Sequence, residues 1–316
     1  MRPAVGEQEK VWCGRIAAEP IFVSQRPHFY NGNRMNRSLL RIALILTVSV
    51  VSAAISHAQR NGPAQYSFGS DTLRYSEQTI GRVSMQVPGG EMVVKSSHVA
   101  GIRIRGVAEG RAEGWYDRLV LRQEGPGAGT QEPSTDGLIG QPFALAVTAT
   151  GRVETQSVPR IPVAVAALTD LSRQFDDFFI TLPTKPLDVG VAWADTVVRA
   201  HGSRPDSASS SRHIRSYRVA RDTIVAGARA AVIALRQVVR VESTSPMPGR
   251  PLQMRTYLEG EETGTALFVV SSGRLHSRER RGTLSGELTI TGGPQPATIP
   301  QRYEYTSILS LQPSPR

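Results

Sequence analysis

Most of the chain beyond residue 70 alternates apolar and polar positions with a period of two, as a strand with one buried and one solvated face does. In Ile102-Arg103-Ile104-Arg105 both isoleucines share one face and both arginines the other. Strands are predicted at 72–77, 82–87, 92–98, 102–105, 115–122, 143–148, 152–158, 193–200, 214–221, 230–242, 265–270, 274–280, 286–291 and 303–311. Segments rich in glycine, serine or proline, at 124–141, 201–212 and 243–252, are predicted as loops. The pattern predicts an antiparallel, mainly β molecule.

One segment follows a different period. Between residues 163 and 179, apolar side chains recur at intervals of three and four, which gathers them on one face of a helix. Pro183 ends this element, because proline lacks the amide hydrogen that a helix needs. We expect a helix over about 163–181, between N-terminal strands at 71–158 and C-terminal strands at 191–311. The predicted fold is mainly β (α+β), a curved antiparallel sheet or half-barrel with this one covering helix. Two smaller packed sheets are the alternative that the pattern leaves open.

Aromatic side chains gather on the apolar face of this predicted helix. Phe175, Phe178 and Phe179 share the face, and Trp193 lies at the start of the next strand. An aromatic stripe at helical spacing is most often part of a hydrophobic core. The alternative is that these four side chains line a cavity for a lipid or another amphipathic ligand. They are the candidate ligand-binding residues of the chain.

A secretory leader is predicted inside the chain rather than at residue 1. The segment that begins at Met35 is basic, residues 42–55 form an apolar run, and small residues precede a cleavage point after Ala58. The run is too short to span a bilayer comfortably, which takes about 20 residues. We expect a signal peptide at 35–58, a mis-assigned and disordered upstream extension at 1–34, and a periplasmic or secreted product.

Composition indicates that the exported part, residues 59–316, is a single β-rich domain with a core of its own. The one cysteine is Cys13, so the exported part has no disulfide, no thiol nucleophile and no lipidated cysteine, and we expect no integral membrane protein after cleavage. The net charge of +10 comes mainly from arginine, since Lys95 and Lys185 are the only lysines after residue 58. Because no long basic run or aromatic-interleaved basic patch occurs, we expect solvated arginine faces and no nucleic-acid partner.

Two motifs carry a resemblance to known proteins. The first is Gly140-Gln-Pro-Phe-Ala-Leu-Ala-Val-Thr-Ala-Thr-Gly-Arg-Val, and the second is Leu182-Pro-Thr-Lys-Pro-Leu-Asp-Val-Gly-Val-Ala-Trp. Over residues 140–198 the chain resembles a family of exported bacterial proteins without an assigned function. That family's fold is similar to the curved half-barrel and covering helix of the lipoprotein-carrier proteins. The family commonly has an acidic residue where Val191 and Ala192 stand here. The resemblance implies a fold and an exported location, and it transfers no catalytic residue.

Motifs for catalysis, metals and nucleotides are missing from the sequence. Four histidines follow residue 58, none at metal-ligand spacing: His98, His201, His213 and His276. No nucleophile elbow or phosphate-binding glycine pattern occurs. Adjacent Asp176 and Asp177 would point in different directions on a helix, which makes them a poor acid–base pair. Glu259, Glu261 and Glu262 are expected in a solvated turn. We therefore predict no catalytic residue, no metal and no cofactor.

Three functions remain open from the sequence. The first is a non-enzymatic exported protein that binds a hydrophobic or amphipathic ligand between sheet and helix. The second is a structural or interaction module of the cell envelope, whose sheet edges or arginine faces bind a protein partner. The third is a hydrolase with a dispersed active site, since such sites are recognised in space and not in sequence. A sealed interior would favour the second function, and an open apolar mouth the first.

Overall fold

The computed structural model describes residues 62–69, 71–127, 129–204, 207–247, 251–293 and 295–313. The predicted signal peptide at 35–58, its cleavage after Ala58 and the extension at 1–34 lie outside the described residues, and they stay predictions.

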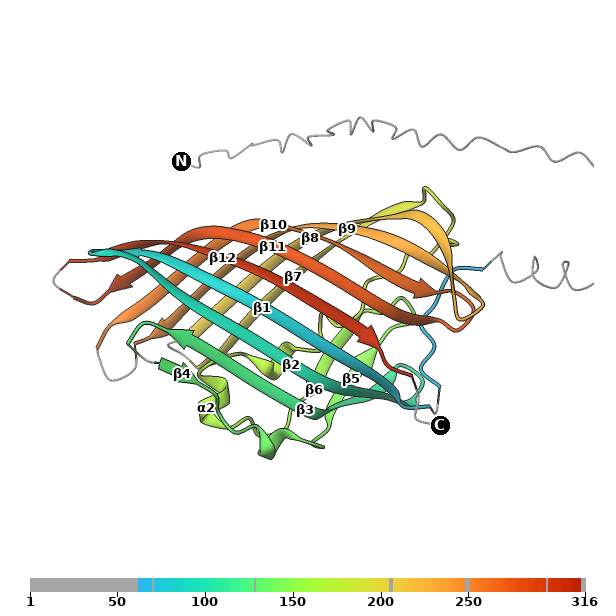
Figure 1. Cartoon of the computed structure of the whole chain (residues 1–316), viewed down its shortest axis with the longest axis horizontal. Coiled ribbons are helices and arrows are strands. Elements are labelled where there is room, and N and C mark those ends of the chain that lie inside the picture. The colour runs from blue at the N-terminus through green and yellow to red at the C-terminus, as the bar shows by residue number, and fades with distance from the viewer. Residues whose placement is uncertain are drawn as a thin grey trace, which may run out of the picture. The chain divides into compact units, whose positions relative to one another are not determined.

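One open antiparallel sheet dominates the structure (Figure 1). Its strands are β1 (Leu73–Val87), β2 (Gly90–Ala108), β3 (Arg111–Gly125), β4 (Gly129–Gln131), β5 (Phe143–Val147), β6 (Val153–Ser157), β7 (Ala192–Arg204), β8 (Ser207–Val225), β9 (Ala228–Pro246), β10 (Gln253–Val269), β11 (Arg274–Thr291) and β12 (Ala297–Leu311). Their order is β6-β5-β3-β2-β1-β12-β11-β10-β9-β8-β7, with β4 paired to β3. The pairing of β1 with β12 joins the N-terminal and C-terminal strands into one sheet. The predicted mainly β fold is confirmed, and the alternative of two packed sheets is wrong.

The predicted helix over 163–181 is wrong beyond its first turn. Only α2 (Val163–Ala166) is α-helical, and a separate 3₁₀ turn, η2 (Leu171–Arg173), follows it. A further 3₁₀ turn, η1 (Asp136–Leu138), precedes β5. The backbone is extended at Asp170, whose Oδ1 accepts a hydrogen bond from the amide of Ser172 at 2.9 Å and so caps the new turn. A continuous helix would also carry Asp176 and Asp177 to the solvated face, whereas both are held against other strands. Tertiary contacts therefore override the helical period of this segment.

The strands are longer than the alternation predicted. The segment 201–212, predicted as a loop, belongs largely to β7 and β8, where Ser209 pairs with Ser243 of β9. Likewise, β9 and β10 extend into the predicted loop at 243–252. Serine and threonine occur on both faces of these extensions and hide the apolar–polar alternation. The sequence pattern therefore did not predict them as strands.

The sheet curls around the segment between β6 and β7 (Figure 1). We call the sheet face that packs against this segment the inner face. Glycines on this face allow strands to approach one another closely. A Cβ atom at Gly260 would lie 2.0 Å from the carbonyl oxygen of Thr283, and one at Gly282 would lie 2.6 Å from the ring of Tyr305. These two positions therefore require glycine.

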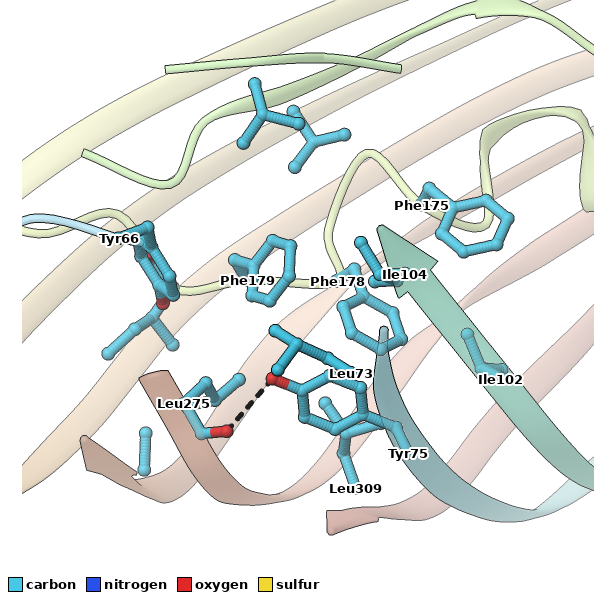
Figure 2. Packing of buried hydrophobic residues seen from close by; sticks show 14 of the residues in the cluster. Tyr66, Leu73, Tyr75, Ile102, Ile104, Phe175, Phe178, Phe179, Leu275 and Leu309 are labelled. Atoms are coloured by element: carbon cyan, nitrogen blue, oxygen red, sulfur yellow. Dashed lines mark hydrogen bonds between the residues drawn. The ribbon is translucent and has the colours of Figure 1, made fainter. Parts of the chain in front are cut away.

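An aromatic core fills one end of the inner face (Figure 2). The side chains of Tyr66 and Tyr75 are buried with Phe178 and Phe179. The Tyr66 hydroxyl donates to the carbonyl of Ile180, and the Tyr75 hydroxyl donates to that of Leu275, both at 3.0 Å. The hydroxyls of Tyr66 and Tyr75 are thus satisfied, and the core ties residues 64–68, the β6–β7 segment and the sheet together.

Candidate functional site

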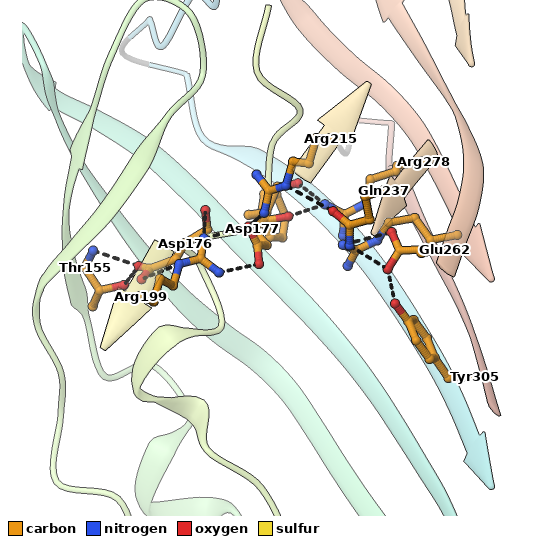
Figure 3. Close-up of polar contacts among 11 residues, drawn as sticks. Thr155, Asp176, Asp177, Arg199, Arg215, Gln237, Glu262, Arg278 and Tyr305 are labelled. Carbon is orange, nitrogen blue, oxygen red and sulfur yellow. Dashed lines mark hydrogen bonds and ion pairs between the residues drawn. The ribbon is translucent and has the colours of Figure 1, made fainter. Parts of the chain in front are cut away.

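A belt of polar side chains crosses the inner face beside the aromatic core (Figure 3). Its members come from six strands and from the β6–β7 segment, and hydrogen bonds or ion pairs connect neighbours. The polar belt consists of Glu77, Asp176, Asp177, Arg199, Arg215, Gln237, Glu262, Arg278 and Arg280. Buried polar groups are costly without partners, and here the partners of the β6–β7 segment lie on the sheet. The belt therefore holds this segment in one position on the sheet.

Two aspartates connect the opposite edges of the sheet. Asp176 accepts hydrogen bonds from the amide and the hydroxyl of Thr155 in β6, at 2.9 and 2.7 Å. Asp177 binds the guanidinium of Arg199 in β7 through both oxygens, at 2.6 and 2.7 Å, and also contacts Arg215 in β8. Burial alone would raise the pKa of Asp177, but these arginines outweigh it and hold the pKa well below its ordinary value. Asp177 is therefore a permanent anion that pairs with arginine.

The belt continues from Arg215 toward β12. The Nε atom of Arg215 donates to Gln237 at 3.1 Å, and the amide of Gln237 donates to Oε2 of Glu262 at 3.0 Å. The hydroxyl of Tyr305 donates to the same Glu262 oxygen. Arg280 lies farther away, with Nη1 3.7 Å from Oε1 of Glu262. The positive charge of Arg280 is thus only partly compensated within the belt.

Arg278 and Glu77 anchor the belt to the aromatic core. The Arg278 guanidinium donates to the carbonyl oxygens of Asp177 and Phe178, the latter at 2.7 Å, and lies 3.8 Å from Glu77. Glu77 also accepts a hydrogen bond from Gln174 at 2.9 Å. Burial lowers the pKa of Arg278 to about 10, so it stays charged near neutral pH.

A cavity of about 440 Å³ opens on the inner face beside the belt. We call it the polar pocket. Residues from the sheet and from the β6–β7 segment line it, among them Glu77, Thr79, Val83, His98, Leu121, Leu168, Gln174, Arg280, Tyr303 and Ser307. Three buried polar atoms of these residues have no hydrogen-bond partner in the described part of the chain: His98 Nε2, Arg280 Nε and Ser307 Oγ. Buried groups of this kind are costly and mark places where a ligand atom can bind.

An apolar strip continues the inner face beyond the polar pocket. Cross-strand pairs place its side chains on one face, because Leu284 pairs with Tyr303, and Tyr303 pairs with Val83. Further along, Leu288 pairs with Ile299. The members are Val83, Met85, Met92, Val94, Val239, Val241, Leu258, Leu284, Leu288, Ile299 and Tyr303. Val239 and Leu284 are buried, and the others are only half-buried. Large half-buried apolar side chains therefore lie next to unpartnered polar atoms.

The sequence-predicted ligand residues lie in or beside the aromatic core. Phe175 and Phe178 are at most 1 % exposed, and the rings of Phe178 and Phe179 pack 5.0 Å apart. Phe179 and Arg199 both line a further cavity of about 400 Å³. Trp193 stacks on Tyr217 instead, 5.2 Å away, and donates from Nε1 to the carbonyl of Thr181 at 2.8 Å. The structure thus brings the three phenylalanines together as core, while their role as ligand contacts stays a prediction.

Sequence reasoning missed the polar belt. Glu262 was expected in a solvated turn with Glu259 and Glu261, but all three lie within β10, and Glu262 is 1 % exposed. Glu259 and Glu261 are on the outer face, where they pair with Arg240 and Arg236 of β9 at 2.9 and 2.7 Å. The available signal was the phase of the alternation: Ala266, an even number of residues from Glu262, is an inward position of β10.

In the part of the chain that the structure describes, no group of three or more histidine, cysteine, aspartate or glutamate side chains is placed to hold a metal ion. The helices of the same part lack the length and hydropathy of a transmembrane segment.

Comparisons with known proteins reach only distant structures. No protein-family model matches the chain, and no curated protein matches it. A structure concerned with lipid–protein interactions in lipovitellin is 13% identical over 79% of this chain, with a TM-score of 0.36, and the match covers about a quarter (26%) of that chain's length. The β domain of the Bordetella autotransporter BrkA is 12% identical, covers 76% of this chain and 98% of its own, and has a TM-score of 0.20. The translocator domain of the Neisseria meningitidis autotransporter NalP is 9% identical, with coverages of 84% and 95% and a TM-score of 0.17. All three TM-scores are below 0.5, so these likenesses carry no argument about what this chain binds.

The family expected from the sequence motifs is not assigned by these comparisons. The large open antiparallel sheet that the resemblance implied is present, whereas its long covering helix is replaced by short turns.

Proposed function

We propose that the protein binds an amphipathic molecule on the inner face of its sheet. The polar end of the ligand occupies the polar pocket, and its hydrocarbon part lies along the apolar strip. The observation that carries this proposal is the direct continuity of the two: Val83 and Tyr303 belong to the strip and also line the pocket. A pocket of about 440 Å³ is within the size range of small-molecule sites.

The energetics fit reversible binding. About twelve methylene groups, each buried at roughly 0.8 kcal/mol, contribute about 10 kcal/mol before any polar contact is counted. Association costs at least about 4 kcal/mol in lost translational and rotational freedom. With contacts to the headgroup, a Kd in the micromolar range follows. This is the behaviour of a protein that takes up and releases its ligand.

The proposal is for binding without chemical conversion, by a protein that works in the periplasm or outside the cell, as its predicted leader implies. The pocket supports this role because Glu77, its acidic group, is already held by Arg278 and Gln174. A carboxylate whose oxygens are occupied by these neighbours is poorly placed to take a proton from a ligand.

A charge placed on the apolar strip tests the proposed function. Ile299→Glu puts a carboxylate on the inner face, whereas Thr298→Glu puts the same group on the outer face of the same strand. Isothermal titration with C16 amphiphiles is expected to show at least a tenfold weaker affinity for Ile299→Glu and an unchanged affinity for Thr298→Glu. Equal affinities in the two variants, or no binding by the wild type, would refute the proposal.

The free edge of β7 favours a second candidate function, an interaction module that binds a protein partner. β7 pairs only with β8 among the described residues, and Val198 on this edge is 68% exposed. On the outer face beside it, Ile214 pairs with Val238, and these side chains are 43% and 36% exposed. An extended segment of a partner could add to this edge as a further strand. Capture of one partner from envelope extract should be lost in Val198→Lys and retained in Ile308→Lys, whose outer-face site lies away from the edge; capture that is equal in both variants would reject this function.

A further inference from the structure

We infer that the ligand carries an anionic oxygen headgroup, a carboxylate or a phosphate, and that a row of hydrogen-bond donors in the polar pocket binds it. The row consists of Arg280, Ser307, Thr79 and His98, from β11, β12, β1 and β2. This inference rests on the proposed function, because it names the chemical class of the amphipathic ligand.

The sheet register places the four side chains next to one another. Arg280 pairs with Ser307, Ser307 pairs with Thr79, and Thr79 pairs with His98. Directly paired residues share a face and have Cβ atoms about 5 Å apart. All four residues line the polar pocket. The donors therefore form one continuous row along the floor of the pocket.

Three of these residues have unused hydrogen-bonding atoms. Ser307 is 3% exposed, and its Oγ has no partner among the described residues. Nε of Arg280 and Nε2 of His98 likewise have no hydrogen-bond partner among the described residues. Leaving such buried groups unpaired is unfavourable, because they have lost water and gained no partner. A ligand with several acceptor oxygens satisfies them together.

Charge selects an anion over a neutral headgroup. Arg280 has only a distant partner, since its Nη1 is 3.7 Å from Oε1 of Glu262, while Oε2 of Glu262 already accepts from Gln237 and Tyr305. The carboxylate that lines the pocket, Glu77, is occupied by Arg278 and Gln174. Arg280 thus faces the pocket with an unpartnered N–H and without a close hydrogen bond to a carboxylate among the described residues, so it can take an anion as a closer partner. A carboxylate or phosphate beside Arg280 forms a charge-assisted hydrogen bond, which is about twice as strong as a neutral one.

Ligands with one chain and different headgroups test this inference. Palmitate, hexadecyl phosphate and hexadecanol are titrated against the full chain by calorimetry below their aggregation concentrations. We expect at least one of the two anions to bind ten times or more tightly than hexadecanol. The ratio between the two anions distinguishes a carboxylate source from a phosphate source. Hexadecanol affinity equal to that of both anions overturns the inference and leaves the proposed function intact, whereas no binding of any of the three refutes both.

Matched variants test whether the row of donors in the polar pocket causes the preference for an anionic headgroup. Arg280→Gln is expected to bring the anion-to-alcohol ratio close to one, while Arg281→Gln, on the outer face of the same strand, keeps the wild-type ratio. Ser307→Ala is expected to lower the ratio about threefold or more, and it decides the matter if Arg280→Gln fails to fold by circular dichroism. A ratio that stays at the wild-type value in the folded row variants overturns the assignment.

Discussion

Replacing Arg278 with methionine is expected to destabilise the folded protein by about 4 kcal/mol. The guanidinium is 3% exposed, donates to two backbone carbonyls of the β6–β7 segment and lies 3.8 Å from Glu77. Methionine fills most of the volume but satisfies none of these acceptors. Removing one partner of a buried ion pair costs about 3–5 kcal/mol, because the other charge stays buried and uncompensated. For a domain of this size, the loss corresponds to a fall in Tm of roughly 10 °C.

Thermal and urea unfolding, followed by circular dichroism, measure this loss. Arg236→Met is the matched control, because it removes an exposed arginine whose partner, Glu261, also faces solvent; its unfolding midpoint should stay essentially unchanged. The double variant Arg278→Met/Glu77→Gln should recover part of the loss, since it no longer buries an unpaired carboxylate. A loss below about 1 kcal/mol for Arg278→Met, or no recovery in the double variant, would refute the reasoning.

Three further predictions concern the backbone and the belt. Gly151→Ala should lower the free energy of unfolding by about 2–4 kcal/mol in urea, because φ is +86° there and a Cβ would lie 2.1 Å from the ring of Tyr66; an unchanged midpoint would contradict this. Gly282→Ala should lower the free energy of unfolding by about 1–3 kcal/mol, because the added methyl group displaces the ring of Tyr305. The double variant Gly282→Ala/Tyr305→Ser should recover part of this loss in thermal unfolding. Burial, assisted by neighbouring arginines, lowers the pKa of His213 from 6.5 to about 4. The unfolded chain therefore takes up this proton first, and stability should fall by up to about 3 kcal/mol as the pH drops from 6.5 to 4. In His213→Gln, the urea midpoint should therefore fall less between pH 6.5 and pH 4 than it does in the wild type.

The polar belt is the common basis of the Arg278, Gly282 and His213 predictions. The β6–β7 segment has little regular structure. Ion pairs of Asp177 with Arg199 and Arg215, and hydrogen bonds from Arg278 to backbone carbonyls of the segment, hold it on the sheet. Replacing a buried pair by apolar residues is often neutral for stability, whereas breaking one partner is costly. The belt therefore positions the segment that forms one wall of the polar pocket, through Leu168 and Gln174.

The fold class could be predicted from the chain alone, because strand alternation is a local property that each segment carries independently. Ile102 and Ile104 were assigned to one buried face from spacing alone, and both are at most 1% exposed. The strand predicted at 230–242, a segment rich in β-branched residues, lies within β9.

The residues that are buried on the inner face depend on long-range contacts that no local pattern shows. Glu262 is buried because Gln237 and Tyr305, 25 and 43 residues away in sequence, supply its hydrogen bonds. The donor row of the polar pocket likewise needs the register of four strands, and one-residue shifts would turn its side chains to the outer face. The helix predicted over 163–181 was lost for the same reason, since the burial of Asp176 and Asp177 depends on arginines that reach them from other strands. Periodicity reports which positions share a face, whereas partners distant in sequence decide whether a charged position on that face is buried.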